Sequence, residues 1–89
     1  MKINSVIKNN LQISDFGIDR MKVLLSKGYK LARKSWNGKN LHVELCPGHY
    51  VGKMWLNDII VIKQEGSDVA NSWVPSMSDF LANDWFIVK

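Results

Sequence analysis

The stretch Y-K-L-A-R-K-S-W-N-G-K-N-L-H-V-E-L, residues 29–45, predicts two antiparallel strands joined by a tight turn. Asn37-Gly38 is typical of a two-residue hairpin turn, in which both residues take a positive φ. Residues 29–36 alternate well enough for the first strand. Residues 41–45 alternate cleanly, which predicts that His42 and Glu44 face outward while the leucines and Val43 face inward.

A helix is predicted before this hairpin, over residues 15–27. Ser14 or Asp15 can cap its start by accepting a hydrogen bond from a free backbone N–H group. Gly28 follows the last helical residue, as helix C-termini prefer. Apolar residues at roughly helical spacing predict one buried face, made by Phe16, Met21, Leu24 and Leu25.

Two more strands are predicted directly after the hairpin. Residues 51–56 are the third strand, and Asn57-Asp58 turns the chain. The fourth strand, residues 59–62, is apolar enough to be buried on both faces. A loop follows at residues 65–68, because Glu, Gly, Ser and Asp stand there in succession.

The C-terminal part predicts a short helix and a last strand. Ser76 can cap a helix over Met77–Ala82, with Asp79 at the third helical position as a weaker capping box. Asn83 can end that helix in the left-handed conformation. Residues 85–88 then form the final strand. The predicted fold class is α+β, a small antiparallel β-sheet with one main N-terminal helix and a short C-terminal helix.

Chain length and cysteine content limit what can stabilise this fold. Its 89 residues make a single domain, in which residues 1–13 form an N-terminal extension of a core at 14–89. So short a chain has a marginal core unless aromatic side chains or contacts between subunits add to it. The single cysteine, Cys46, excludes an intrachain disulfide and a Cys/His metal cluster.

The charge balance and the apolar pattern narrow the class of protein. Twelve Lys and Arg residues against 8 Asp and Glu give a net charge of +4, which attracts phosphates, nucleotides and nucleic acid. No apolar run approaches the length of a membrane span, and residues 1–10 lack the apolar region of a signal peptide. With a free thiol in addition, the sequence predicts a cytosolic protein without a membrane partner.

Catalysis is poorly supported by the sequence. His42 lies on the predicted outer face of a strand, and His49 lies in a turn. Neither has a nucleophile or a carboxylate at a spacing that would indicate a catalytic pair. Cys46 has no evident base, so a small core side chain is favoured over a nucleophile. No Gly-rich phosphate loop occurs. We expect neither an enzyme nor a bound cofactor or metal.

Aromatic rings and amides beside positive charge indicate a ligand site instead. Stacking of a base on an aromatic ring is worth roughly 1–3 kcal/mol. Trp85 is expected in the core and Trp55 in the core or an interface, whereas Trp36 and Trp73 fit core and ligand roles equally well. Arg33 could meet a phosphate through its bidentate fork. Hydrogen bonds to a sugar or base could come from Asn37, Ser76, Ser78, Asp79 and Asp84.

Two segments together resemble the phage family of Thoeris anti-defence proteins of the second type. The first is G-Y-K-L-A-R-K-S-W-N-G-K, residues 28–39, and the second is W-V-P-S-M-S-D-F-L-A-N-D-W-F-I-V, residues 73–88. The resemblance covers roughly residues 15–88. The sequence departs from the family pattern in the extension before Ser14 and in a compact middle, residues 47–70.

The resemblance implies a sponge that binds the glycocyclic, cyclic ADP-ribose-type signal of Thoeris defence without cleaving it. The TIR protein makes this signal, and its capture keeps the effector that depletes NAD switched off. The resemblance also implies a homotetramer with ligand pockets between protomers, in the cytoplasm of the infected bacterial host. Nucleic acid is not the expected partner.

The family motifs also imply roles for single residues. Trp36 and Trp73 would stack on the adenine or close the pocket wall, and Arg33 would pair with the pyrophosphate. Ribose or base would be hydrogen-bonded by Asn37, Ser76, Asp79 and Asp84. The alternative for Ser76 and Asp79 is helix capping, and for Asp84 a turn residue that bonds its own backbone.

Other functions stay open on the residues alone. Small antiparallel sheets with surface aromatics and a pI near 9.4 often bind single-stranded nucleic acid, which is the main alternative. An enzyme that cleaves the nucleotide signal and a phage protein that inhibits another protein are further alternatives. Recovery of an unchanged small molecule after denaturation would distinguish a sponge from an enzyme.

Overall fold

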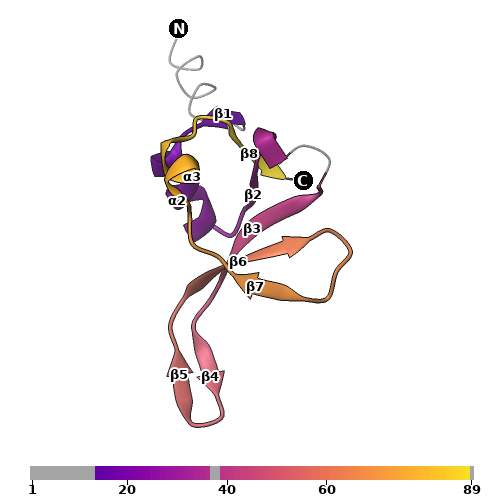
Figure 1. Ribbon diagram of the computed structural model, residues 1–89. Helices are drawn as coiled ribbons and strands as arrows, with labels where there is room; N and C mark the ends of the chain where they lie inside the picture. Colours follow the sequence, from indigo (N-terminus) through magenta and orange to yellow (C-terminus); the bar gives the residue numbers. More distant parts are fainter. Residues whose placement is uncertain (1–13, 37–38, 89) are drawn as a thin grey trace, which may run out of the picture.

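The structure is a computed structural model that describes residues 14–36 and 39–88. Six strands form an antiparallel sheet in the order β1-β8-β2-β3-β6-β7, and β4 and β5 form a separate hairpin (Figure 1). The sheet strands are β1 (Ser14–Phe16), β2 (Lys30–Arg33), β3 (Leu41–Cys46), β6 (Ile59–Gln64), β7 (Ala70–Ser72) and β8 (Trp85–Val88). The helices are α2 (Ile18–Ser26) and the short α3 (Met77–Leu81). The predicted α+β class is confirmed.

Helix α2 packs against one face of the sheet and builds the core. Its Met21, Leu24 and Leu25 are buried together with Leu31 of β2 and Val43 of β3, as part of one apolar cluster. The predicted apolar face of the helix is therefore confirmed for these residues. Gly28 takes φ 93°, and its N–H donates to the Leu25 carbonyl at 3.0 Å, as a helix terminus requires.

The predicted start of this helix is wrong. It begins at Ile18, its cap position is Gly17, and no side chain caps it. Ser14–Phe16 instead forms strand β1, paired antiparallel with β8. Asp15 has φ 60° and the pairing shifts between Ser14 and Phe16, which leaves Phe16 only 4% exposed. Burial of Phe16 from a strand thus replaces its predicted place on the helix.

The predicted hairpin joins the correct strands with a longer connection. Leu31 pairs with Val43, but β2 ends at Arg33 and residues 34–36 form a 3₁₀ turn, so the first strand is shorter than predicted. The Lys34 N–H donates to the Asp84 carbonyl at 3.0 Å and the Ser35 N–H to Asp84 Oδ2 at 3.1 Å. Asp84 thereby holds the backbone that follows β2. The predicted turn at Asn37-Gly38 lies outside the described residues.

Strands β3 and β6 continue outward as a projecting hairpin, the arm, made of β4 (His49–Val51) and β5 (Met54–Leu56) (Figure 1). The single strand predicted over residues 51–56 is therefore wrong, because the chain reverses at Gly52, whose φ is 62°. Cys46 pairs with Ile59 at the end of β3 and β6, and His49 pairs with Leu56 in the arm. The arm therefore keeps the pairing register of β3 and β6. All six strand residues of the arm are exposed.

The remaining predictions near the C-terminus are mostly confirmed. The fourth and the last strand, the loop at residues 65–68 and the short helix all form. Helix α3 ends at Leu81, one residue earlier than predicted. Asn83 is not left-handed, because Ala82 already leaves the helix with ψ 151°. Strand β7 was not predicted. No helix within the described residues is long and apolar enough to cross a membrane.

The outer face of the sheet is not solvent-exposed as the alternation predicts. His42 is only 3% exposed and Ala32 likewise 3%. Both residues belong to neighbouring strands, on the face opposite Leu31 and Val43, because side chains alternate along each strand. This second face carries the pocket described next.

Candidate functional site

Three tryptophans from distant parts of the sequence form one cluster. Trp36 ends the 3₁₀ turn, Trp73 follows β7 and Trp85 begins β8. Their ring centroids lie 5.5 to 6.2 Å apart, and each pair is arranged edge to face, the geometry that aromatic rings prefer. Trp85 is fully buried, as expected, and its Nε1–H donates to the Asp79 carbonyl at 3.3 Å. Trp36 and Trp73 are half-buried around it.

Arg33, Asp79 and Asp84 form an ion triad beside these rings. Arg33 Nε donates to Asp84 Oδ1 at 2.8 Å, and Nη1 donates to Asp79 Oδ1 at 2.9 Å. The side chains of Arg33 and Asp79 are 13% and 12% exposed, and that of Asp84 is 29% exposed. The triad connects the end of β2 to α3 and to the start of β8. Asp79 follows Arg33 by 46 positions in the sequence, and Asp84 follows it by 51.

The two carboxylates of the triad are held in their ionised form. Burial alone raises the pKa of Asp79, but hydrogen bonds from the Ser76 N–H and Arg33 outweigh it, and the pKa lies below its ordinary value. For Asp84, burial is likewise outweighed by hydrogen bonds from Arg33 and the Ser35 N–H, so its pKa is also lowered. The hydrogen bond to Asp84 raises the pKa of Arg33 further above its ordinary value.

The structure brings six of the seven predicted site residues together: Arg33, Trp36, Trp73, Ser76, Asp79 and Asp84. Asn37 lies outside the described residues. Ser76 and Asp79 form the predicted capping box of α3, in which Ser76 Oγ accepts from the Asp79 N–H at 3.1 Å and Asp79 Oδ2 accepts from the Ser76 N–H at 2.9 Å. Contacts of these residues with a pyrophosphate, ribose or base stay predictions.

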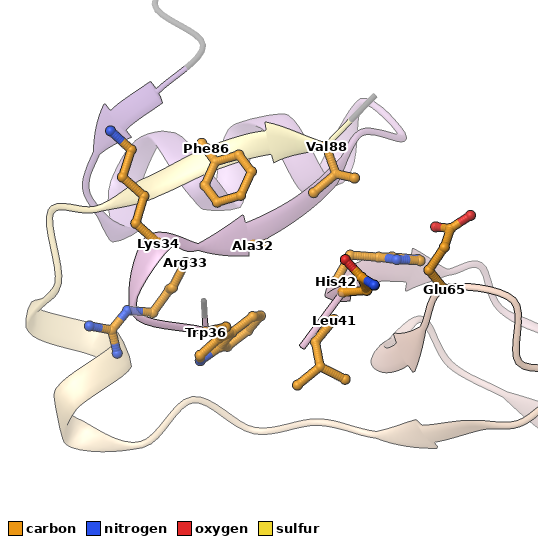
Figure 2. Close-up of a pocket in the computed structure, with 10 residues that line it drawn as sticks. Ala32, Arg33, Lys34, Trp36, Leu41, His42, Glu65, Phe86 and Val88 are labelled. Carbon is orange, nitrogen blue, oxygen red and sulfur yellow. The ribbon is translucent and has the colours of Figure 1, made fainter. Parts of the chain in front are cut away.

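An open pocket of ≈ 380 Å³ lies on the second face of the sheet, at the edge of the tryptophan cluster (Figure 2). Its floor and walls come from β2, β3, β8, the 3₁₀ turn and the loop after β6. Of the six predicted site residues that the structure describes, only Arg33 and Trp36 line it. The other lining residues are Ala32, Lys34, Asn40, Leu41, His42, Glu65, Phe86 and Val88.

Charge is distributed unevenly along this pocket. Lys34 and Arg33 lie at one end, with Trp36 and Phe86 next to them, and His42 and Glu65 lie at the other end (Figure 2). Arg33 is neutralised by the triad, whereas Lys34 Nζ makes an exposed ion pair with Asp15 at 2.7 Å. Lys34 therefore supplies the more accessible positive charge.

Sequence reasoning missed most of the pocket. His42 was assigned to an outer strand face, and Phe86 and Val88 were assigned only to the last strand. Alternation shows which residues share a face of a sheet, but it does not show what covers that face. A signal was present in β8, where apolar residues stand at successive positions. Such runs indicate that both faces of a sheet are used.

The other residues considered for chemistry lie away from the pocket. Trp55 is 56% exposed on the arm, so a place in the core of the chain is excluded, and it stacks edge to face on Tyr50 with centroids 5.2 Å apart. His49 is exposed on the same arm, and its Nδ1 lies 3.0 Å from the Pro47 carbonyl. In residues 14–36 and 39–88, no three His, Cys, Asp or Glu side chains are placed to hold a metal ion.

Comparison with known proteins identifies the family. Residues 18–88 match the model of the Thoeris anti-defense 2-like domain. The chain is also 34% identical over 78 residues to Thoeris anti-defense 2 of Bacillus phage SP01, covering 74% of this chain and 86% of that protein. The match includes the 3₁₀ turn, α3 and β8, which carry the tryptophan cluster and the ion triad. The chain therefore belongs to the Thoeris anti-defense 2-like family.

Proposed function

We propose that this protein is a phage inhibitor of Thoeris defence that sequesters the defence signal. It binds the TIR-made, cyclic ADP-ribose-type nucleotide without cleaving it, in the cytoplasm of the infected bacterial host, so the NAD-depleting effector stays inactive. Family membership supports the anti-defence role. The observation that carries the sequestration proposal is the pocket between Trp36 and β8, which combines an aromatic wall, an apolar floor and an accessible cation.

The pocket has the chemistry that such a nucleotide needs. The adenine can lie against Trp36 and Phe86, because every base offers a π-face for stacking. Lys34 attracts the pyrophosphate at the end where the rings lie. The volume of ≈ 380 Å³ falls within the roughly 300–1,000 Å³ of small-molecule sites. The ion triad holds Trp36 in place through the Ser35 N–H bond to Asp84.

One chain leaves this pocket open, so the proposed binding unit is a homo-oligomer, as the tetramer implied by the family would provide. The arm exposes Tyr50, Val51, Met54 and Trp55, which are 52 to 71% accessible. Tyr and Trp are enriched among the residues that dominate the energy of interfaces. We therefore propose the arm as a contact between subunits that helps to enclose the ligand.

Incubation of the protein with glycocyclic ADP-ribose isomers tests sequestration. Calorimetry should show binding of at least one isomer, and heat denaturation should release it with an unchanged mass. The released molecule should activate the Thoeris effector again, whereas the intact complex should not. A converted product would identify an enzyme, and absence of any binding would refute the proposal.

Single-stranded nucleic acid is the alternative ligand that one observation favours. Tyr50 and Trp55 form an exposed, edge-to-face pair on the arm of a protein with net charge +4. Such binding would weaken steeply with salt. Fluorescence anisotropy with labelled oligonucleotides at two salt concentrations distinguishes the two functions, because the sequestration proposal expects no specific binding there.

A further inference from the structure

His42 is a buried histidine in the wall of the pocket. It is 3% exposed, although alternation along β3 predicted an outward position. A buried polar ring needs hydrogen bonds, because loss of hydration is otherwise uncompensated. Its Nε2 meets that need, since it lies 2.8 Å from Oε2 of Glu44, two residues along the same strand. The ring is thus held in one orientation by its neighbour.

This contact fixes which nitrogen carries the proton. An ionised carboxylate only accepts hydrogen bonds, so Nε2 of His42 carries the hydrogen and donates it to Glu44. In the neutral form of the ring, Nδ1 then has no hydrogen and acts as an acceptor. Within the described part of the chain no group hydrogen-bonds to Nδ1, and this nitrogen is not sealed in the protein. His42 lines the pocket, so Nδ1 is the ring nitrogen left for a bound ligand.

The position of His42 in the pocket matches a ligand donor. Lys34 lies at the opposite end, which suits the pyrophosphate, and Glu65 lines the same end as His42 (Figure 2). A carboxylate and a bare ring nitrogen both accept hydrogen bonds and both disfavour a phosphate. This end therefore fits the part of a nucleotide that donates hydrogen bonds.

We propose that His42 is a specificity-determining residue, whose Nδ1 accepts a hydrogen bond from an amine or hydroxyl of the bound nucleotide. Glu44 is a positioning residue that sets the orientation and tautomer of the ring. This inference rests on the proposed function. A site built to bond a polar group rejects ligands that lack it, because its own buried group is then left unpaired. The His42 contact would thus select among cyclic nucleotides of similar size.

A matched pair of variants separates this role from a structural one. His42→Gln can keep a donor to Glu44 at the place of Nε2 while losing the acceptor at Nδ1. His42→Asn can keep an acceptor near Nδ1 while losing the bond to Glu44. Calorimetry with glycocyclic ADP-ribose should show about tenfold or more loss of affinity for His42→Gln, with little change in its thermal unfolding. His42→Asn should bind more tightly than His42→Gln.

Two further measurements make the outcome decisive. In the free protein near pH 8, ¹⁵N NMR of the His42 ring should find the proton on Nε2; a proton on Nδ1 overturns the inference without reference to any ligand. A ligand analogue with hypoxanthine in place of adenine keeps the hydroxyls and lacks the amine. If the amine is the donor, His42→Gln should bind this analogue as wild type does; if a hydroxyl is, the loss should persist.

The two proposals fail differently. Wild-type protein that binds no isomer refutes the proposed function and this inference with it. Wild-type binding with unchanged affinity in His42→Gln overturns the inference alone and leaves His42 a structural residue. Equal losses in both variants, together with lowered unfolding temperatures, would likewise identify a structural role.

Discussion

At the scale of single residues, Arg33 connects three elements that are far apart in the sequence: β2, α3 and the start of β8. Its guanidinium bonds carboxylates that follow it by 46 and 51 positions, and Asp84 in turn bonds the backbone before Trp36. Two carboxylates this close to one another need the cation between them. Arg33 therefore acts first as the residue that orders the tryptophan cluster.

Replacing Arg33 by Met should lower the free energy of unfolding by about 2–3 kcal/mol at pH 7, because both acidic partners lose their cation. Asp79 and Asp84 have lowered pKa values in the folded protein, so the stability from the triad is complete above the ordinary pKa of 3.8 and is lost as the pH falls through the lowered values. Urea unfolding at several pH values should show the two proteins converging in acid. A pH-independent difference would show that lost packing, not charge, is the cause.

Trp36 and Trp73 form a matched pair for testing the pocket. Both are half-buried in the same cluster, but only Trp36 lines the pocket. Either change to Ala should cost about 2–3 kcal/mol of unfolding free energy, less than for a fully buried Trp. Trp36→Ala should also lose at least tenfold in affinity for the nucleotide in calorimetry, and Trp73→Ala much less. Equal affinity losses would place the ligand elsewhere on the cluster.

At the scale of elements, α3 owes its start to a local hydrogen-bond exchange. Ser76→Ala removes the acceptor for the Asp79 N–H, and the free energy of unfolding should fall by about 1 kcal/mol. Ser76→Thr keeps a hydroxyl there and should cost much less. Denaturant unfolding measures both. If Ser76→Ala leaves stability unchanged but weakens nucleotide binding, Ser76 contacts the ligand instead of serving mainly as a cap.

The arm depends on one close backbone approach. A Cβ at Gly48 would lie 2.7 Å from Trp55 Cζ2 and 2.9 Å from the Leu56 carbonyl oxygen, so Gly48→Ala must displace the arm. The change should cost about 1–3 kcal/mol and alter the fluorescence of Trp55. Asn57→Ala, an exposed change on the same hairpin, is the control and should do neither. An unaltered Trp55 environment in Gly48→Ala would show that this close approach does not position the Trp55 ring.

Elements that depend on local signals were predictable, and those that depend on distant partners were not. The capping box at Ser76 and the apolar strand at residues 59–62 each carry their evidence within a few residues. Strand β1 exists because Phe16 pairs with distant β8 and Asp15 takes a positive φ. The candidate site divides in the same way. Its residues were predictable from the resemblance to family motifs, whereas the burial of His42 depends on neighbouring strands and was not predictable.

At the scale of the whole molecule, the exposed arm predicts association. A double variant, Tyr50→Ser with Trp55→Ser, removes the exposed ring pair of the arm without touching the core cluster. Light scattering after gel filtration should show a smaller assembly than wild type, and nucleotide affinity should fall because the pocket stays open. Val23→Ser, an exposed apolar change on α2, is the control. An unchanged mass would exclude the arm as the main subunit contact.

The pairing register is the same in the β3–β6 strand pair and in the β4–β5 arm that continues it, and this restricts where residues can be inserted or deleted. Cys46 faces Ile59 and His49 faces Leu56, so body and arm share one alternation of sides. Deleting one residue from each strand at the junction would turn the Tyr50–Trp55 pair to the reverse side, and deleting two from each would restore it. Shortening both strands at the junction should therefore keep the side of this pair for an even number of residues and reverse it for an odd number.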